Sequence, residues 1–365
     1  MQASTQKNRS PGPFLALAVL IGIATPVRSE VINVSFDEPT LDRWMYPFSG
    51  NPGFQTFASI FGAITDQEVG FDPGFDNRDG QMLIGFDTSM VVPAGLGAGS
   101  YTITATSVFL TVKTDEAFGY DPTLDLWASW LATGDPAFVA DRDPGRAVEL
   151  FGAGFRDGWS ASTFPEDGPF CAACSCFPPS VCKSLRNVYP IDFDLACASG
   201  DVSNNVDEQT DPVPWAIATH TALNQGQLVP IDTELTFAVN VADPCIQAYL
   251  QAALDDGMLD FVVASIFLAV PQQEGGFPKI YTKEDSLVQL GIVSAARLTM
   301  TVEVIDCPAD LNGDGVVNVL DLIDLLLCFG QPAVPGCGPE DVNGDGAVNV
   351  LDLIDLLLDF GQACP

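Results

Sequence analysis

Two stretches near the carboxyl end carry oxygen-bearing side chains at a spacing that suits a metal ion. "DLNGDGVVNVLDLIDLLLCFGQ" begins at Asp310 and "DVNGDGAVNVLDLIDLLLDFGQ" begins at Asp341, and 19 of their 22 positions are identical. Side-chain oxygens recur at loop positions 1, 3, 5, 9 and 12, position 6 is glycine, and position 7 offers a backbone carbonyl. This pattern of hard oxygen ligands is typical of a calcium-binding loop. The predicted ligands are Asp310, Asn312, Asp314, Val316, Asn318 and Asp321, followed by Asp341, Asn343, Asp345, Ala347, Asn349 and Asp352.

The sequence therefore predicts two bound Ca2+ ions, one in each copy. Carboxylates held this close together repel one another unless a cation neutralises them. The alternative is a pair of turns rich in Asp and Asn that hold no ion, which leaves the same five positions unexplained twice. Position 12 is Asp in both copies, whereas the common loop has a bidentate Glu, so each loop must close more tightly or coordinate the ion differently. No amphipathic helix leads into either loop, and each copy is predicted to be a loop followed by one helix.

A duplicated loop-helix unit of this kind resembles the dockerin type I domain. The resemblance rests on the pattern D-x-N-x-D-G-x-x-N-x-x-D in both copies and covers residues 308–365. It implies a small, all-α, EF-hand-like domain over residues 306–365 that binds calcium and docks onto a cohesin-like or other surface protein. It also implies an extracellular setting of polysaccharide binding or degradation. Where well-studied dockerins have Ser or Thr for the cohesin contact, this chain has Val319, Leu320, Val350 and Leu351, and the basic residues expected further along the helix are absent.

Each predicted helix carries two apolar rows. We expect the first row to pack against its twin, which pairs Leu322, Leu325, Leu326 and Phe329 with Leu353, Leu356, Leu357 and Phe360. A two-helix unit of this size can hardly bury a second row as well, and an apolar row left over marks an interface. Whether that row contacts another protein or the chain's own larger domain stays open. The predicted interface residues are Val319, Leu320, Ile323, Leu327, Val350, Leu351, Ile354 and Leu358.

Residues 1–29 have the layout of a secretory signal peptide. Lys7 and Arg9 precede an apolar run over residues 14–25, and small residues at Val27 and Ser29 precede Glu30. The run is shorter than the about 20 residues that a membrane-spanning helix needs. An uncleaved anchor is the alternative reading, and no other stretch predicts a membrane span. We therefore expect a secreted or cell-surface protein.

The acidity of the chain excludes some partners. Without residues 1–29 the chain has 11 basic and 48 acidic residues, a formal charge of −37. Such a surface repels nucleic acid and anionic membranes, and it suits divalent cations and neutral partners such as uncharged glycans. The alternative is that the acidity only provides solubility. An apolar content of 47% with 24 Phe nevertheless predicts packed cores and not a disordered acidic tail.

The ten cysteines predict disulfides, because an exported protein meets an oxidising environment. A zinc site in "CAACSCFPPSVC" is the alternative, although the one histidine, His220, lies far along the chain. In the repeat, Cys307 and Cys364 bracket both copies, and Cys328 and Cys337 flank the linker between them. These two pairings are guesses, since sequence does not fix connectivity. The other six lie in or near the central segment: Cys171, Cys174, Cys176, Cys182, Cys197 and Cys245.

Residues 30–305 are predicted to be mainly β, as a β-sandwich or jelly-roll domain. Stretches with β-branched and aromatic residues at a period close to two predict strands that begin near Gln81, Ser100, Thr233, Leu259 and Ala296. A helix is predicted from Cys245. Residues 115–230 have little strand signal and are expected to form an irregular insert containing Cys and Trp.

Two fragments of this domain resemble a DNRLRE-type, galactose-binding-like β-sandwich module. They are "DNRDGQMLIGFDTS", continued by "VPAGLGAGSYTITATSVFLTV", and "FPKIYTKEDS", continued by "AARLTMTVEV". The order of signal peptide, β-sandwich and dockerin-like tail is also similar to exported proteins of planctomycete-type bacteria. For the protein as a whole we expect a role in carbohydrate-associated binding or in extracellular assembly.

No catalytic residue is assigned. Glycosidases use a pair of carboxylates, but with 48 acids the sequence spacing is uninformative. Trp127, Trp130, Trp159 and Trp215 are expected in the core, with stacking on sugar rings as the alternative. Three functions remain in view: a non-catalytic protein docked by its calcium-binding tail, a polysaccharide-degrading glycoside hydrolase carried by that tail, and a structural component of the cell surface.

Overall fold

The computed structural model describes residues 28–62, 64–66, 70–71, 74–172, 183–269, 276–333 and 336–364. The chain forms two compact units, one made of Ser29–Asp306 and one that contains Cys307–Pro365. Most of the predicted signal peptide, together with Cys174, Cys176 and Cys182, lies outside the described residues. Within the described part of the chain, every helix is too short or too polar to cross a membrane.

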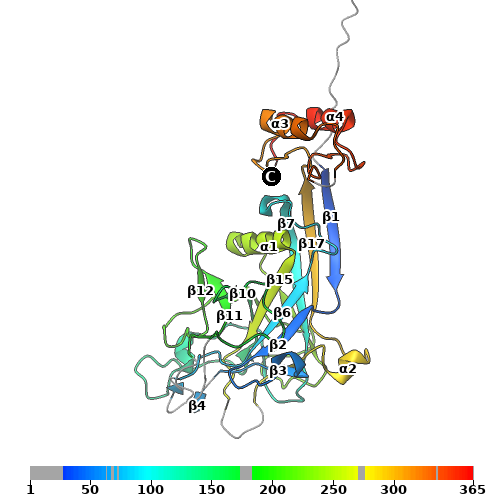
Figure 1. The fold of residues 1–365 in the computed structure, drawn as a ribbon. Helices are drawn as coiled ribbons and strands as arrows, with labels where there is room; N and C mark the ends of the chain where they lie inside the picture. The colour runs from blue at the N-terminus through cyan, green and yellow to red at the C-terminus, as the bar shows by residue number, and fades with distance from the viewer. Residues whose placement is uncertain are drawn as a thin grey trace, which may run out of the picture. The chain divides into compact units, whose positions relative to one another are not determined.

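The larger unit is mainly β, as the sequence predicts. Its first sheet has four strands in the order β1-β17-β7-β14, and the long strands β7 and β17 are antiparallel neighbours (Figure 1). A register shift between Thr301 and Val302 of β17 marks a bulge in this pair. The strands are β1 (Arg28–Phe36), β7 (Tyr101–Thr111), β14 (Glu234–Ala238) and β17 (Arg297–Asp306).

The second sheet has seven strands. Its order is β12-β11-β10-β15-β6-β2, and β13 pairs with β10 beside this path. Its strand pairings are all antiparallel. The strands are β2 (Leu41–Met45), β6 (Gln81–Asp87), β10 (Glu149–Phe155), β11 (Val188–Phe193), β12 (Ser199–Asp201), β13 (Ala216–Ile217) and β15 (Met258–Ala264).

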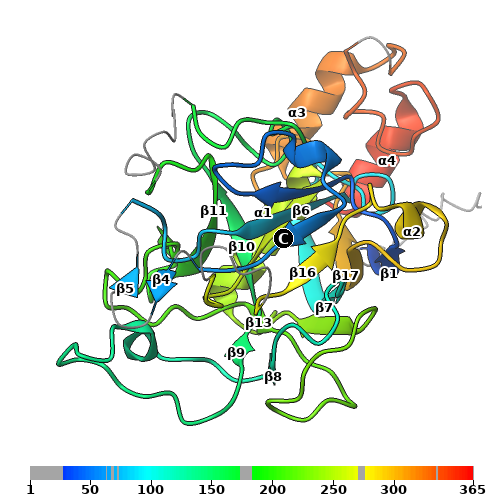
Figure 2. The same ribbon diagram turned by 90° about the horizontal axis from the view of Figure 1, so that it is seen from below.

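Shorter elements complete the larger unit. Figure 2 shows β8 and β9 side by side, and they form a parallel pair. The small pairs are β3 (Phe57–Ser59) with β16 (Lys279–Tyr281), β4 (Ile64–Asp66) with β5 (Gly70–Phe71), and β8 (Tyr120–Asp121) with β9 (Arg146–Ala147). The helical elements are η1 (Pro52–Phe54), η2 (Ala98–Ser100), η3 (Trp127–Trp130), α1 (Pro244–Asp256) and α2 (Ser286–Gln289).

One hydrophobic core joins the two sheets. Alternation along β6 sends Ile84 and Phe86 into this core, whereas Leu83 faces a second cluster on the other side of the sheet. Helix α1 adds Leu250 and Leu254 to the main core. It begins where the side chain of Asp243 accepts hydrogen bonds from two backbone N–H groups, and it ends at Gly257, which has a φ of 77°.

The segment expected to be an irregular insert, residues 115–230, contributes strands β8 to β13. Strand β10 lies between β11 and β15, near the middle of the seven-stranded sheet. Two glycines on β10 give room to neighbouring rings: a Cβ on Gly152 would come within 2.1 Å of Trp215, and one on Gly154 within 2.5 Å of Tyr189. Trp130 and Trp215 are both buried, so the core reading of these two residues is confirmed.

The C-terminal unit contains two helices that contact each other, α3 (Val319–Cys328) and α4 (Val350–Leu358). Each follows one of the predicted loops, as expected. The expectation of an all-α domain is not supported, because β-bridges join Val316 to Ala363 and Pro332 to Ala347. Disulfides join Cys307 to Cys364 and Cys328 to Cys337, which confirms both predicted pairings. In the larger unit Cys197 is joined to Cys245. The small core of the C-terminal unit is formed by Ala309, Val317, Leu325, Val348 and Leu356.

Candidate metal sites

Each loop closes onto the start of its own helix through the acid at position 12. Asp321 accepts hydrogen bonds from the backbone N–H groups of Asn312, at 3.1 Å, and Asn318, at 2.7 Å. It is fully buried and lies in the first turn of α3, where the helix dipole favours a negative charge. Asp352 repeats both contacts in the second loop, at 3.1 and 2.7 Å. The shorter Asp thus closes the loop by holding backbone groups on both sides of it.

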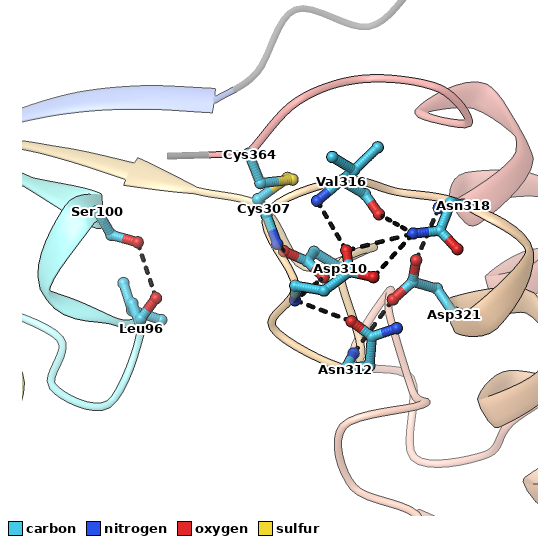
Figure 3. The surroundings of a disulfide bond; sticks show 11 residues. Leu96, Ser100, Cys307, Asp310, Asn312, Val316, Asn318, Asp321 and Cys364 are labelled. Atoms are coloured by element: carbon cyan, nitrogen blue, oxygen red, sulfur yellow. Dashed lines mark hydrogen bonds between the residues drawn. A yellow bond between two sulfur atoms is a disulfide. The ribbon is translucent and has the colours of Figure 1, made fainter.

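The side chains at positions 1, 3 and 5 of the first loop accept hydrogen bonds from the loop's own backbone. Asp310 accepts from the N–H groups of Asp314 and Gly315, at 3.2 and 2.9 Å, and Asn312 Oδ1 accepts from Asp314 at 2.8 Å. Figure 3 shows Asp310, Asn312 and Asp321 close together beside the Cys307–Cys364 disulfide. One carboxylate oxygen from each of Asp310, Asp314 and Asp321 lies within 4.8 Å of the others. These oxygens keep free lone pairs and can bind one cation together.

The second loop has the same hydrogen bonds at nearly the same lengths. Asp341 accepts from Asp345 and Gly346, at 3.0 and 2.8 Å. Its three carboxylates, however, are not within 4.8 Å of one another, as those of the first loop are. The glycines at position 6, Gly315 and Gly346, have φ values of 83° and 95°, which a residue with a side chain rarely adopts. The two loops thus share one frame and differ in how tightly their carboxylates gather.

The asparagine at position 9 has two roles that the sequence did not reveal. Its Oδ1 caps the helix, since Asn318 accepts from the N–H of Leu320 at 2.8 Å. Its Nδ2 points into the loop and donates to the Asp314 carboxylate and, at 2.8 Å, to the carbonyl oxygen of Val316. A donor therefore lies where the ligands at positions 5 and 7 meet, and this is where the loop requires positive charge. The three-residue spacing of Asn318 and Asp321 is the capping-box signal that could have indicated this arrangement.

The C-terminal unit has no base of its own to neutralise these acids. Residues 307–365 contain no Lys, Arg or His. Two unit charges 4 Å apart repel by about 1 kcal/mol in water and by about 4 kcal/mol at the effective dielectric of a protein surface. An all-oxygen donor set with three carboxylates suits a hard divalent cation such as Ca2+. The acids are Asp310, Asp314, Asp321, Asp324, Glu340, Asp341, Asp345, Asp352, Asp355 and Asp359.

A neighbouring group of possible ligands cannot bind a metal through its cysteines. Cys328, Cys337 and Glu340 come close enough to surround an ion, but the two cysteines form a disulfide and offer no thiolate. Cys197, Cys245, Cys307 and Cys364 are disulfide-bonded as well. Among the described residues, every cysteine is oxidised, so the zinc reading finds no support there.

The second apolar row, predicted to be an interface, is exposed along its length. Leu327 is 79% exposed, and each of the other seven is at least 40% exposed. The first row is only partly as expected. Leu325 and Leu356 are fully buried, whereas Leu326, Phe329, Leu357 and Phe360 are exposed. The expectation that all of the first row packs between the copies is therefore wrong, because two helices of this length enclose one central layer of side chains and leave the flanking layers open.

Comparison with protein families and with curated proteins finds no relative of this chain. No family model matches the chain, and no curated protein is significantly similar to it. The assignment of the loops accordingly rests on their own geometry and charge.

Proposed function

We propose that the C-terminal unit binds two Ca2+ ions and uses its exposed apolar rows to dock the larger β unit to an extracellular protein partner. The unit would act in the manner of a dockerin, and its partner would be cohesin-like or another surface protein with an apolar docking face. The single observation that carries the proposal is the repetition of one hydrogen-bonded, carboxylate-rich loop within residues 307–365, which contain no basic residue.

Calcium binding and docking are linked through the helices. The acid at position 12 is at once a loop residue and part of the capping box that starts the helix. One cation in each loop, held in part by Asp321 or Asp352, would bind the folded loops and not the unfolded chain, and would therefore stabilise the folded state by mass action. The exposed rows on those helices would then be presented in a fixed arrangement, so docking should depend on calcium.

The chemistry of the rows indicates the kind of partner. They contain Val, Leu and Ile and no basic residue, which differs from a surface that recognises acidic groups. Apolar rows of this kind fit a groove lined with aliphatic or aromatic side chains. A role in polysaccharide binding or degradation follows from the resemblance to dockerins and remains part of the proposal, with the larger unit as the glycan-associated part.

The docking claim is tested by binding the full chain to an envelope preparation from its native cells. We expect binding with Ca2+ and none after chelation. Leu327→Asp combined with Leu358→Asp should abolish binding and leave Ca2+ uptake unchanged, because both exposed residues lie beyond position 12 of their loops. Asp324→Asn, which changes an α3 acid outside the loops, serves as the matched control. Binding that persists in the double variant, or in chelator, would contradict the proposal. Retention on a panel of neutral glycans tests the role of the larger unit.

A further inference from the structure

A second group of carboxylates lies in the larger unit, far from the two loops in sequence. Asp42 belongs to β2, Glu166 to the segment between β10 and β11, and Glu284 to the segment before α2. One carboxylate oxygen of each lies within 4.8 Å of the others. No spacing in the sequence brings these residues together, so the cluster exists only in the folded chain.

Two oxygens of this cluster are buried without a partner. Asp42 is fully buried, and its Oδ2 accepts from the backbone N–H of Lys283 at 2.8 Å, whereas its Oδ1 has no hydrogen-bond partner. Glu284 Oε2 is also buried and unpartnered. A buried carboxylate oxygen without a donor destabilises the fold, because it has lost water and gained nothing in return. The cluster therefore requires either a cation or a proton.

The bases around the cluster contact only its Glu166 side. Lys283 Nζ lies 2.7 Å from Glu166 Oε2 and donates to the carbonyl oxygen of Thr40. Arg43 Nη1 donates to the carbonyl oxygens of Glu166 and Gly168. Both bases thus compensate the Glu166 side of the cluster, and no basic side chain donates to Asp42 or Glu284 among the described residues. Burial, followed by the charge of Glu284, raises the pKa of Asp42 well above its usual range.

We propose that Asp42, Glu166 and Glu284 form a third divalent-cation site, located in the larger unit and taking Ca2+. Three carboxylates without nitrogen or sulfur donors suit a hard cation. The ion would supply the positive charge that the unpartnered oxygens of Asp42 and Glu284 lack. It would also fasten the edge strand β2 to two segments that are remote in sequence, much as a disulfide would. The site is independent of the C-terminal loops and goes beyond the docking function.

A second acidic cluster provides a matched control. Asp121, Asp125 and Asp143 also approach within 4.8 Å of one another. Asp121 Oδ2 is also buried without a partner, but here each of the three carboxylates accepts from a side chain. Arg146 Nη1 donates to Asp125 at 2.9 Å, Gln225 Nε2 to Asp121 at 2.9 Å and Thr123 Oγ1 to Asp143 at 3.1 Å. Replacing Asp143 by Asn should therefore leave Ca2+ binding unchanged.

The tryptophans allow the third site to be observed separately. All five lie in the larger unit, and residues 307–365 contain neither Trp nor Tyr. Thermal unfolding followed by Trp fluorescence consequently reports on the unit that holds the proposed site. With the full chain, Ca2+ alone should raise the melting temperature seen by Trp by several degrees, and Asp42→Asn or Glu284→Gln should abolish that rise. The second variant guards against a folding defect of the first.

Counting bound ions separates this proposal from the one for the loops. We expect three Ca2+ ions per wild-type chain, two in Asp42→Asn and one in the combined variant Asp314→Ala with Asp345→Ala. Three ions in Asp143→Asn would support the assignment. It would be overturned if Asp42→Asn kept every ion of the wild-type chain, or if the Trp-detected melting temperature did not change with Ca2+. If the wild-type chain bound a single Ca2+ ion and Asp42→Asn bound none, the loops would hold no ion. That result would refute the docking proposal and support the third site.

Discussion

Val317 donates its backbone N–H to the carbonyl oxygen of Gln362 at 3.0 Å, so the first loop is held by the segment that follows the second helix. The reverse contact also exists, because Val348 donates to the carbonyl oxygen of Gln331 at 2.9 Å. Each loop is therefore held by a backbone hydrogen bond to the segment that follows the helix of the other copy. This reciprocity gives a physical reason for the duplication: neither loop is complete without its twin.

Binding at the two loops should consequently be coupled. Asp345→Ala removes a predicted ligand of the second loop, and the Ca2+ dissociation constant of the first loop should rise about 5- to 150-fold, the usual range for coupled sites. Isothermal titration calorimetry on the full chain, with Asp42→Asn as background to remove the third site, measures it. Asp324→Asn is the control and should leave the constant unchanged. An unaltered first loop in Asp345→Ala would mean that the copies act independently.

The apolar residues of α3 should divide into two classes. Leu325→Ala opens a cavity in the small core and should destabilise the C-terminal unit by about 2–5 kcal/mol. Leu327→Ala, at an exposed position, should change the stability by less than about 0.5 kcal/mol. Thermal unfolding followed by far-UV circular dichroism gives both values. Equal losses in the two variants would show that the second row is covered in solution.

The two disulfides of the C-terminal unit should differ in how much they stabilise it. Cys307 and Cys364 are 57 residues apart, and replacing both by Ser should destabilise the unit by about 4 kcal/mol through the entropy of the unfolded chain. Cys328 and Cys337 are 9 residues apart, and their replacement should lower the stability by about 2.5 kcal/mol. Chemical denaturation in the presence of Ca2+ tests the order of the two values. The reverse order would argue against loop closure as the source of the stabilisation.

Much of the larger unit could be predicted because its strands alternate. The stretches from Gln81, Ser100 and Ala296 became β6, β7 and β17, since one side of each faces the shared core. Strand β10 was missed for a physical reason. Its sequence, "ELFGAGF", contains glycines at the two positions where the rings of Trp215 and Tyr189 fill the space of a side chain. Glycine weakens the local strand signal, while the packing that demands it comes from residues far along the chain.

The candidate sites show the same division. The proposed ligands of each loop could be predicted because all of them fall within twelve consecutive residues, whose order fixes their geometry. The backbone hydrogen bonds from each loop to Gln331 or Gln362 of the other copy could not be predicted from the sequence, because they depend on how the two copies pack together. The sequence could not predict the cluster of Asp42, Glu166 and Glu284 either, because its residues come from three separate segments that meet only in the folded chain.

Stability of the larger unit should depend on pH through Asp260. Both of its carboxylate oxygens are buried without a hydrogen-bond partner, and burial raises its pKa to about 8. Between about pH 4 and about pH 8 the folded chain keeps a proton that the unfolded chain has lost, so the free energy of unfolding falls as the pH rises. The slope from this group is about 1.4 kcal/mol per pH unit.

Asp260→Asn should remove this part of the pH dependence. Urea unfolding followed by Trp fluorescence, from about pH 5 to about pH 8, gives the slope as the difference between wild type and variant. Asp256→Asn, at an exposed position near the end of α1, should keep the wild-type slope. If Asp260→Asn unfolds with the same pH dependence as wild type, the carboxyl group is ionised in the folded chain and has a donor.

Calcium uptake by the repeated loops is the claim on which the docking function depends, and calorimetric titration of the full chain tests it most directly. The Asp314→Ala variant combined with Asp345→Ala should take up two Ca2+ ions fewer than wild type, and Asp324→Asn should match wild type. Equal uptake by the double variant and wild type would contradict the account.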